Sequence, residues 1–486
     1  MPRGRCLIPA AACSMALLGA CSGGSGVPSA PLSGSTLART WVDARGNGTL
    51  APGPGEPMVA RTALGGRARG VRVLARFAQI TDAHVTDEES PARVEMLDRL
   101  GPPFTSAFRP QEALTTQVLA AIVRSVNATR PQAVFETGDL IDNDQANELA
   151  QALAVLRGGP VDPGSGGPGY TGVQQASNAD PLIYRPDVDP PRYRGLLAAA
   201  ERPFRSPGLA APWYPIPGNH DLLVQGNVRA TAATNAVATG SRKLVTLDRG
   251  ALRAARTRRL APAVVARLLS HGLPGTSIQV PADPGRREEP PRQVVAGLRG
   301  ASGHGGRGPL MDARVDIGPS TAAVLLDTAS RRGGARGVLR PDQVTWLRRQ
   351  LESAGDRWVV VFSSTPLEAT HLGHRALALL DRDPRVVAAV AGDVHRNTIA
   401  PRLTPAGGYW LITTSSLIDY PQQARAFRLV ATAGGGVVLE TWMLNADPRS
   451  RLANVARRLA YLDYQGGRPQ GYAGRPGDRN ARLYKP

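Results

Sequence analysis

Cysteine is nearly absent from this 486-residue chain, which has three, Cys6, Cys13 and Cys21. The chain beyond residue 21 can therefore form no disulfide bond and no thiolate zinc site. Aromatic residues are also scarce, at 5% of the chain, which argues against the stacking surfaces used by single-stranded nucleic acids. After the N-terminal region, no apolar run is long enough to predict a transmembrane helix.

Lysine is equally scarce, because only Lys243 and Lys485 occur among the 58 basic residues. The formal net charge is nonetheless +19, carried by arginines scattered through Ala-, Gly- and Pro-rich sequence. A nucleic-acid-binding arm would show a dense basic run, and this chain has none. The charge therefore indicates no particular partner, and no nucleic acid is expected.

The first 21 residues have the pattern of an export signal. Arg3 and Arg5 precede an apolar stretch, residues 7–18, that is too short to span a bilayer. The sequence Leu18-Gly19-Ala20-Cys21 then resembles the lipobox of bacterial lipoproteins, which implies cleavage before Cys21 and lipidation of its thiol. A plain secretory signal cleaved near Ala20 is the alternative. Both predict export, either as a cell-envelope lipoprotein anchored to the membrane by its lipid or as a secreted protein.

Composition divides the remaining chain into three parts. Residues 22–70 are rich in Gly, Pro, Ser and Ala, and we predict a flexible tether there, with a candidate first short strand near residues 36–42. Residues 71–444 are predicted to form the main domain, with long irregular insertions near 158–212 and 224–314. A C-terminal helix and a frayed tail are predicted for residues 445–486.

Strand and helix patterns alternate through the main domain, which predicts an α/β architecture. Apolar runs predict strands at residues 71–80, 133–135, 321–327, 357–362, 386–391, 410–414 and 437–443. Apolar residues at helical spacing predict helices at residues 110–128, 147–156, 193–200, 341–351 and 451–461.

Four polar motifs follow, or directly adjoin, predicted strands. They are Asp82-Ala83-His84, Gly138-Asp139-Leu140-Ile141-Asp142, Gly218-Asn219-His220-Asp221 and Gly392-Asp393-Val394-His395. Because ligands converge at the carboxyl ends of strands in α/β sheets, these side chains are predicted to meet. Residues i and i+2 of a strand share a face, so the Asp and His of the first motif are predicted to act together. Oxygen and imidazole ligands without thiolates favour Mn, Fe, Zn or Mg over a structural zinc.

In this order the motifs resemble those of the calcineurin-like metallophosphoesterase superfamily, whose pattern is D-x-H, G-D-x-x-D, G-N-H-[DE], a strand-end His and G-H-x-H. The resemblance covers roughly residues 71–444, outside the insertions. The stretches 343–347 and 416–421 also resemble an exported bacterial branch of this superfamily. The resemblance implies a four-layer α/β/β/α sandwich of two mixed sheets, with a metal centre at the strand ends.

The resemblance also implies two divalent metal ions and a set of ligands. The first ion would be held by Asp82, His84, Asp139 and His395. Asp139 would bridge to the second ion, which Asn219 would also bind.

The same resemblance implies that His220 is the general acid that protonates the leaving oxygen, oriented by Asp142. A metal-bound hydroxide would attack phosphorus in line. Asp221, next in sequence to His220, is a further candidate for orienting or charging its ring.

Two positions depart from the family pattern. Ser364 stands where the strand-end His is expected, and Asp393 replaces the first His of G-H-x-H. Both missing imidazoles are second-metal ligands in the family. The remaining oxygen ligands favour Mg, Mn or Ca over Zn, so the second site is expected to bind weakly, to stay empty or to take a harder cation. His371 and His374 are candidates to replace the imidazole at Ser364, although exposed loop histidines are the simpler prediction.

These observations lead to a metal-dependent phosphoester hydrolase that acts on a phosphorylated substrate outside the cytoplasm. The alternative is a catalytically impaired relative that binds a phosphorylated or anionic ligand. The loss of two imidazoles motivates this alternative. Retention of His220 and Asp142 speaks against it, because a binding protein has little need of a general acid.

Overall fold

The computed structural model describes residues 27, 29–100, 105–248, 250, 275–304, 306, 308–463 and 469–486. The predicted export signal and Cys21 lie outside the described residues. Among those that are described, no helix has the length and apolar character needed to cross a membrane.

The first sheet has seven strands in the order β3-β19-β18-β17-β4-β5-β8. Its parallel part consists of β4 (Gly70–Ile80), β5 (Ala133–Glu136) and β8 (Trp213–Pro215). Its antiparallel part adds β17 (Gln423–Thr432), β18 (Val437–Asn445) and β19 (Ala481–Lys485), and β3 (Val59–Arg61) lies parallel to β19 at the edge. The sheet is therefore mixed, as predicted.

The second sheet has six strands in the order β11-β12-β13-β14-β16-β15. Four of them are parallel, namely β12 (Thr321–Leu326), β13 (Trp358–Ser363), β14 (Val386–Ala391) and β16 (Tyr409–Thr413). The antiparallel edge strands are β11 (Ala313–Asp316) and β15 (Thr398–Arg402).

The two sheets pack face to face. Phe362 of β13 contacts Phe77 of β4 and Phe135 of β5, with ring centroids 6.0 and 4.2 Å apart. Along β12, Ala323 and Leu325 belong to this central core, whereas their neighbours belong to a second core on the helix side. Burial on both faces explains why the central strands are continuously apolar in sequence.

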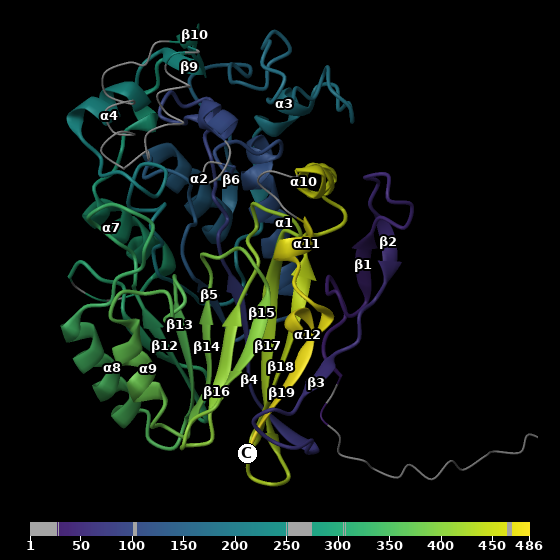
Figure 1. The fold of residues 1–486 in the computed structure, drawn as a ribbon, viewed down its shortest axis with the longest axis vertical. Coiled ribbons are helices and arrows are strands. Elements are labelled where there is room, and N and C mark those ends of the chain that lie inside the picture. The colour runs from purple at the N-terminus through teal and green to yellow at the C-terminus, as the bar shows by residue number, and fades with distance from the viewer. Residues whose placement is uncertain are drawn as a thin grey trace, which may run out of the picture.

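Helices cover the outer faces of both sheets. On the first sheet lie α1 (Thr115–Ala128), α2 (Ala146–Arg157) and α10 (Arg451–Leu462). On the second lie α8 (Pro341–Ser353) and α9 (Gly373–Leu380), which stand beside β12, β13 and β14 in Figure 1. The predicted α/β/β/α order of layers is confirmed.

Both ends of the described chain differ from the prediction. The candidate strand near residues 36–42 is present as β1 (Arg39–Val42), but it forms a hairpin with β2 (Ala51–Pro54), and β3 follows where only a tether was expected. The expected frayed tail ends in β19, whose Leu483 is fully buried. The tail is ordered because β19 pairs with β18 on one side and β3 on the other, which satisfies backbone groups that a sheet edge would leave open.

The insertions carry the shorter elements. The first contains β6 (Gly159–Val161), α3 (Leu196–Ala200) and β7 (Phe204–Ser206), and the second contains α4 (Ala232–Ala238), β9 (Arg242–Leu247), β10 (Gly275–Gln279) and α7 (Pro291–Ser302). In Figure 1, α3, α4, β9 and β10 lie at the top of the molecule, far from the C-terminus. Two short helices, α11 (Pro469–Tyr472) and α12 (Pro476–Arg479), precede β19.

Candidate metal centre

The four motif loops leave the carboxyl ends of β4, β5, β8 and β14 and meet in one cleft of about 460 Å³. Seven of the eight predicted ligands and catalytic residues line this cleft, and they are His84, Asp139, Asp142, Asn219, His220, Asp393 and His395. The eighth, Asp82, is buried directly behind His395. The structure therefore brings together side chains that span more than 300 positions of sequence.

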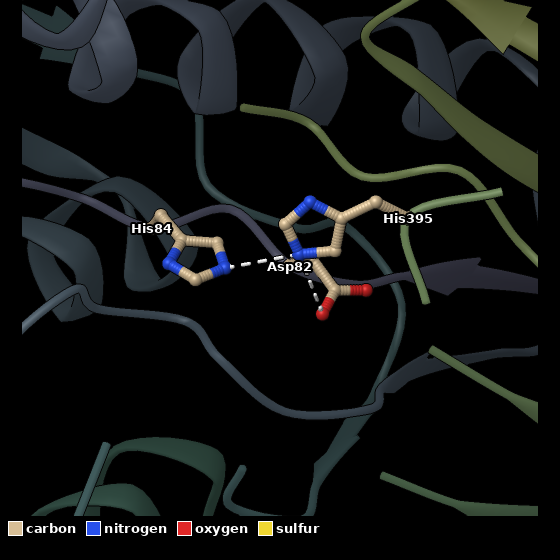
Figure 2. A group of neighbouring side chains, drawn as sticks. All are labelled: Asp82, His84 and His395. Atoms are coloured by element: carbon tan, nitrogen blue, oxygen red, sulfur yellow. Dashed lines mark hydrogen bonds and ion pairs between the residues drawn. The ribbon is translucent and has the colours of Figure 1, made fainter. Parts of the chain in front are cut away.

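Three of these residues form a compact group of ligand atoms. Asp82, His84 and His395 offer atoms that all lie within 4.8 Å of one another (Figure 2). The Nε2 atoms of the two imidazoles are 3.3 Å apart, and Asp82 Oδ1 is 3.6 Å from His395 Nε2. Asp139 Oδ2 lies 3.9 Å from His84 Nε2, at the edge of the same group.

The opposite nitrogen of each imidazole is engaged by a carboxylate. His84 Nδ1 lies 3.0 Å from Asp142 Oδ1, and His395 Nδ1 lies 2.5 Å from Asp419 Oδ2. Since an ionised carboxylate can only accept, both Nδ1 atoms donate, and in the neutral ring each Nε2 then presents a lone pair. Although burial opposes it, the hydrogen bond to Asp419 raises the pKa of His395, so either a proton or a cation can lie between the two Nε2 atoms at 3.3 Å. These residues therefore fit a metal ion.

The two carboxylates are ionised because buried arginines hold them. Arg93 donates to Asp142, and Arg109 Nε donates to Asp419 Oδ1 at 2.6 Å. Although burial opposes ionisation, these arginines and the histidine hydrogen bonds keep the pKa of Asp142 and of Asp419 well below the usual range. Burial, helped by the neighbouring His220, lowers the pKa of His84 to about 3, so its ring is neutral.

The remaining carboxyl groups are crowded and short of positive charge. Burial, followed by repulsion from Asp82, raises the pKa of Asp393 to about 7. Burial and the same neighbour raise the pKa of Asp139 well above its usual range, and burial also raises the pKa of Asp82. A divalent cation stabilises the ionised form of buried carboxyl groups whose pKa is raised in this way.

Asp142 also contacts the predicted general acid. His220 Nδ1 lies 2.8 Å from the backbone oxygen of Asp142 and 3.6 Å from its carboxylate. The shorter contact of the carboxylate is with His84, so Asp142 serves two histidines through different atoms.

The Asp221 carboxylate binds backbone groups and not the His220 ring. It accepts from the backbone N–H groups of Gly218 and Ile141, at 2.7 and 3.0 Å. It therefore joins the loop after β8 to the loop after β5.

The motif loops adopt an unusual backbone. Asp82, His84, Asp139, Asp393 and His395 all have positive φ, between 44° and 69°. The prediction that strand alternation brings the first two together is therefore wrong in its reason, although both side chains reach the same site. The loops are held by backbone hydrogen bonds from Asp82 N to Gly138 O and from His84 N to Asp139 O, both 2.9 Å. Left-handed non-glycine residues persist only where such contacts fix them, and they cluster at functional sites.

Comparison with known proteins agrees with this geometry. No protein-family model matches the chain. Over 96 residues the chain is 33% identical to the glycerophosphodiester phosphodiesterase GpdQ of Enterobacter lignolyticus (strain SCF1), covering 18% of this chain and 34% of that protein. The chain thus spans about a third of the length of the curated relative that it matches.

The converging ligand atoms belong to the four motifs identified in the sequence. In the order and residue types of its four motifs, the chain is similar to the calcineurin-like metallophosphoesterase superfamily. Two solved structures align over most of it at low similarity. A dimetal phosphatase from Danio rerio is 12% identical over 77% of this chain and 99% of that chain, with a TM-score of 0.39. A purple acid phosphatase from yellow lupin seeds is 12% identical over 83% and 57%, with a TM-score of 0.31.

The residues predicted for the second metal site offer oxygen atoms in place of imidazoles. Asn219 Nδ2 donates to Gly226 O at 2.9 Å, which leaves Asn219 Oδ1 for a cation. Asp139 and Asp393 line the cleft beside it. Ser364 is buried and shares a 2.8 Å hydrogen bond with Thr328, so it does not face the cleft.

His371 and His374 do not replace the missing imidazole. Both are exposed, and neither lines the cleft. The backbone of His371 instead bonds to Gly337 and Leu339, which fixes it beside the loop before α8.

Proposed function

We propose that this chain is a metal-dependent phosphoester hydrolase that acts outside the cytoplasm. The observation that carries the proposal is the pair of Nε2 atoms on His84 and His395, 3.3 Å apart with both Nδ1 atoms already engaged. We assign a first cation to this pair with Asp82 and Asp139, and a second to Asp139, Asn219 and Asp393. Bound divalent cations would activate a water molecule and offset negative charge on the phosphoryl oxygens.

We assign His220 as the general acid. Its Nδ1 is held by the backbone oxygen of Asp142, so a proton delivered to a leaving oxygen must come from Nε2 of the doubly protonated ring. Burial lowers the pKa of His220, and the Asp142 carboxylate, 3.6 Å from the ring, partly offsets that effect by favouring the protonated form. A group held in this way can transfer a proton in the transition state, which contributes about 10²–10⁴-fold in rate.

The walls of the cleft favour a substrate with an apolar group beside the phosphorus. Val94, Leu97 and Ala107 line it on the segment before α1, and Val394 lies between the two ligands of the last motif. Because the matched relative carries the name of a phosphodiesterase, phosphodiesters belong among the first substrates to test.

Hydrolysis of phosphomonoester and phosphodiester substrates by the chain from Ser22 onward tests the proposal. The protein is stripped of metal and then given Mn, Fe, Zn, Mg or Ca. We expect Mn or Mg to restore turnover, His220→Ala to lower it about 10²–10⁴-fold, and Asp139→Asn to abolish it. His374→Ala is the matched control, because His374 is exposed and outside the cleft.

Absence of turnover with every metal, while metal still binds, would contradict the hydrolase and support the ligand-binding alternative. The extracytoplasmic site is a separate part of the proposal. Mass spectrometry of the processed N-terminus would test it, since lipidation at Cys21 predicts a diacylglycerol mass on that residue, and a plain signal predicts an unmodified N-terminus near it.

A further inference from the structure

A carboxylate from outside the four motifs holds one of the proposed metal ligands. Asp419 lies on the loop that follows β16, and its side chain is fully buried. Its Oδ2 is 2.5 Å from Nδ1 of His395, on the side of the ring opposite the nitrogen that faces His84. The same loop also reaches another ligand, since the backbone N–H of Leu417 donates to the backbone oxygen of Asp82 at 3.0 Å.

Asp419 is itself held from the other side by the segment that precedes α1. Arg109 donates from Nε to Asp419 Oδ1 at 2.6 Å and from a terminal nitrogen to Oδ2 at 3.3 Å. Gln111, two residues later, donates to the backbone oxygen of Ile418 at 2.9 Å. Arg109 and Gln111 therefore both hydrogen-bond to the loop that contains Asp419, and Arg109 binds the carboxylate in a bidentate geometry.

One buried residue joins this arrangement to its counterpart at His84. Glu112 Oε2 accepts from the backbone N–H of Arg109 at 3.1 Å and from the guanidinium of Arg93 at 2.8 Å. Arg93 in turn holds Asp142, which holds His84. Each imidazole of the first site is therefore hydrogen-bonded to a carboxylate that is itself held by an arginine. Glu112 links the two series of hydrogen bonds, because it contacts both Arg93 and Arg109.

We propose that Asp419, clamped by Arg109, is a positioning residue that holds His395 in the tautomer and orientation needed to bind the first metal ion. The inference rests on the proposed metal centre. A carboxylate on the far nitrogen fixes the ring and raises its basicity as a ligand. A role in folding alone explains the pair less well, because burying an arginine and an aspartate costs desolvation that apolar side chains would avoid.

Metal affinity tests this inference without any need for turnover. Mn²⁺ is titrated into the metal-stripped full-length chain by calorimetry, and the absorption of Co²⁺ in the same protein reports the ligand geometry. Asp419→Ala is expected to weaken the tightest Mn²⁺ site about 10- to 100-fold and to change the Co²⁺ spectrum. Asp419→Asn, which keeps the shape and one acceptor oxygen, is expected to lose less.

Asp327→Asn is the matched control. Asp327 is also buried and also ion-paired, with Arg331, but it contacts none of the proposed ligands. It should lower thermal stability without changing Mn²⁺ affinity or the Co²⁺ spectrum. If Asp419→Ala does not fold, Asp419→Asn and Arg109→Lys carry the same test.

The outcomes separate the two proposals. Wild-type protein that takes up no metal would refute the proposed metal centre and this inference with it. Wild-type protein that binds metal, beside folded Asp419 variants with unchanged affinity and spectrum, would refute the positioning role and leave the metal centre standing.

Discussion

The substitution Gly226→Ala should displace the His220 ring and lower its activity as the proposed general acid. The backbone of Gly226 has φ +68°, and a Cβ built there would lie 2.3 Å from His220 Cδ2 and 2.5 Å from its Nε2. The same Cβ would lie 2.4 Å from Asn219 Nδ2, whose hydrogen bond ends on the oxygen of Gly226. Gly226→Ala therefore pushes on the proposed general acid and on a proposed ligand of the second metal at once.

The size of the effect follows from the distances. Ordinary contacts of a Cβ begin at 3.4 Å, so the ring must retreat by about 1 Å. A displacement of about 1 Å can cost about 10²-fold in rate, equivalent to about 2.7 kcal/mol. The left-handed backbone adds about 1–2 kcal/mol of destabilisation for any residue with a Cβ. We expect kcat/KM to fall about 100-fold and the protein to remain folded.

Gly435→Ala isolates the backbone contribution, because Gly435 has φ +87° and nothing within 4 Å of the added Cβ. Both variants should lose similar stability in urea denaturation, and only Gly226→Ala should lose phosphodiester hydrolysis. Equal activity in the two variants would refute the role assigned to His220 and the geometry of its loop.

Four further outcomes are expected. His220→Ala should lower kcat about 10²–10⁴-fold while Mn²⁺ affinity, measured by calorimetry, stays near wild type. Adding Mn²⁺ at 100 times its Kd should stabilise the stripped protein by about 2.7 kcal/mol in thermal unfolding, and Asp82→Asn should reduce that gain. Asp393→His should tighten the second site for Zn²⁺, measured by competition with a chelator. Burial raises the pKa of Glu288 to about 7, so its destabilising effect is absent below its ordinary pKa and complete above about pH 7. Glu288→Gln should therefore increase the free energy of unfolding by about 1–3 kcal/mol at about pH 8 and by little at about pH 4.5.

The central strands could be predicted because they are buried on both faces and so are apolar throughout. Strand β17 could not, because Arg425 and Arg428 interrupt its pattern. Arg425 is fully buried and donates to backbone and side-chain oxygens of other segments, among them Asn397 and Thr414. Arg428 pairs with Glu440 across the sheet. The partners of these two arginines cannot be recognised from sequence spacing. Tertiary contacts therefore determine that this segment forms a strand.

The site divides in the same way. The residues of the four motifs could be predicted, because parallel strands end at one edge and local motifs mark those ends. The left-handed backbone of Asp82 and His84 could not, since it depends on hydrogen bonds to the loop after β5. Asp419 and Arg109 could not be assigned a role either, because they are 310 residues apart and meet only through folding. The stretch that contains Asp419 did resemble a family branch, and this was the available signal.

The arrangement of charge supports the proposal that the first metal site is kept despite the loss of two imidazoles. Five ligand residues hold a left-handed backbone, at a cost of about 1 kcal/mol or more each. Two buried arginine–carboxylate pairs add a desolvation cost. Their common effect is to turn the Nε2 atoms of two imidazoles toward one point, which fits a bound cation. Both arginine–carboxylate pairs orient imidazoles of the first site. Among the described contacts, no such pair orients the oxygen atoms proposed for the second site. The first ion should therefore bind more tightly than the second, and the supply of the second ion should limit turnover.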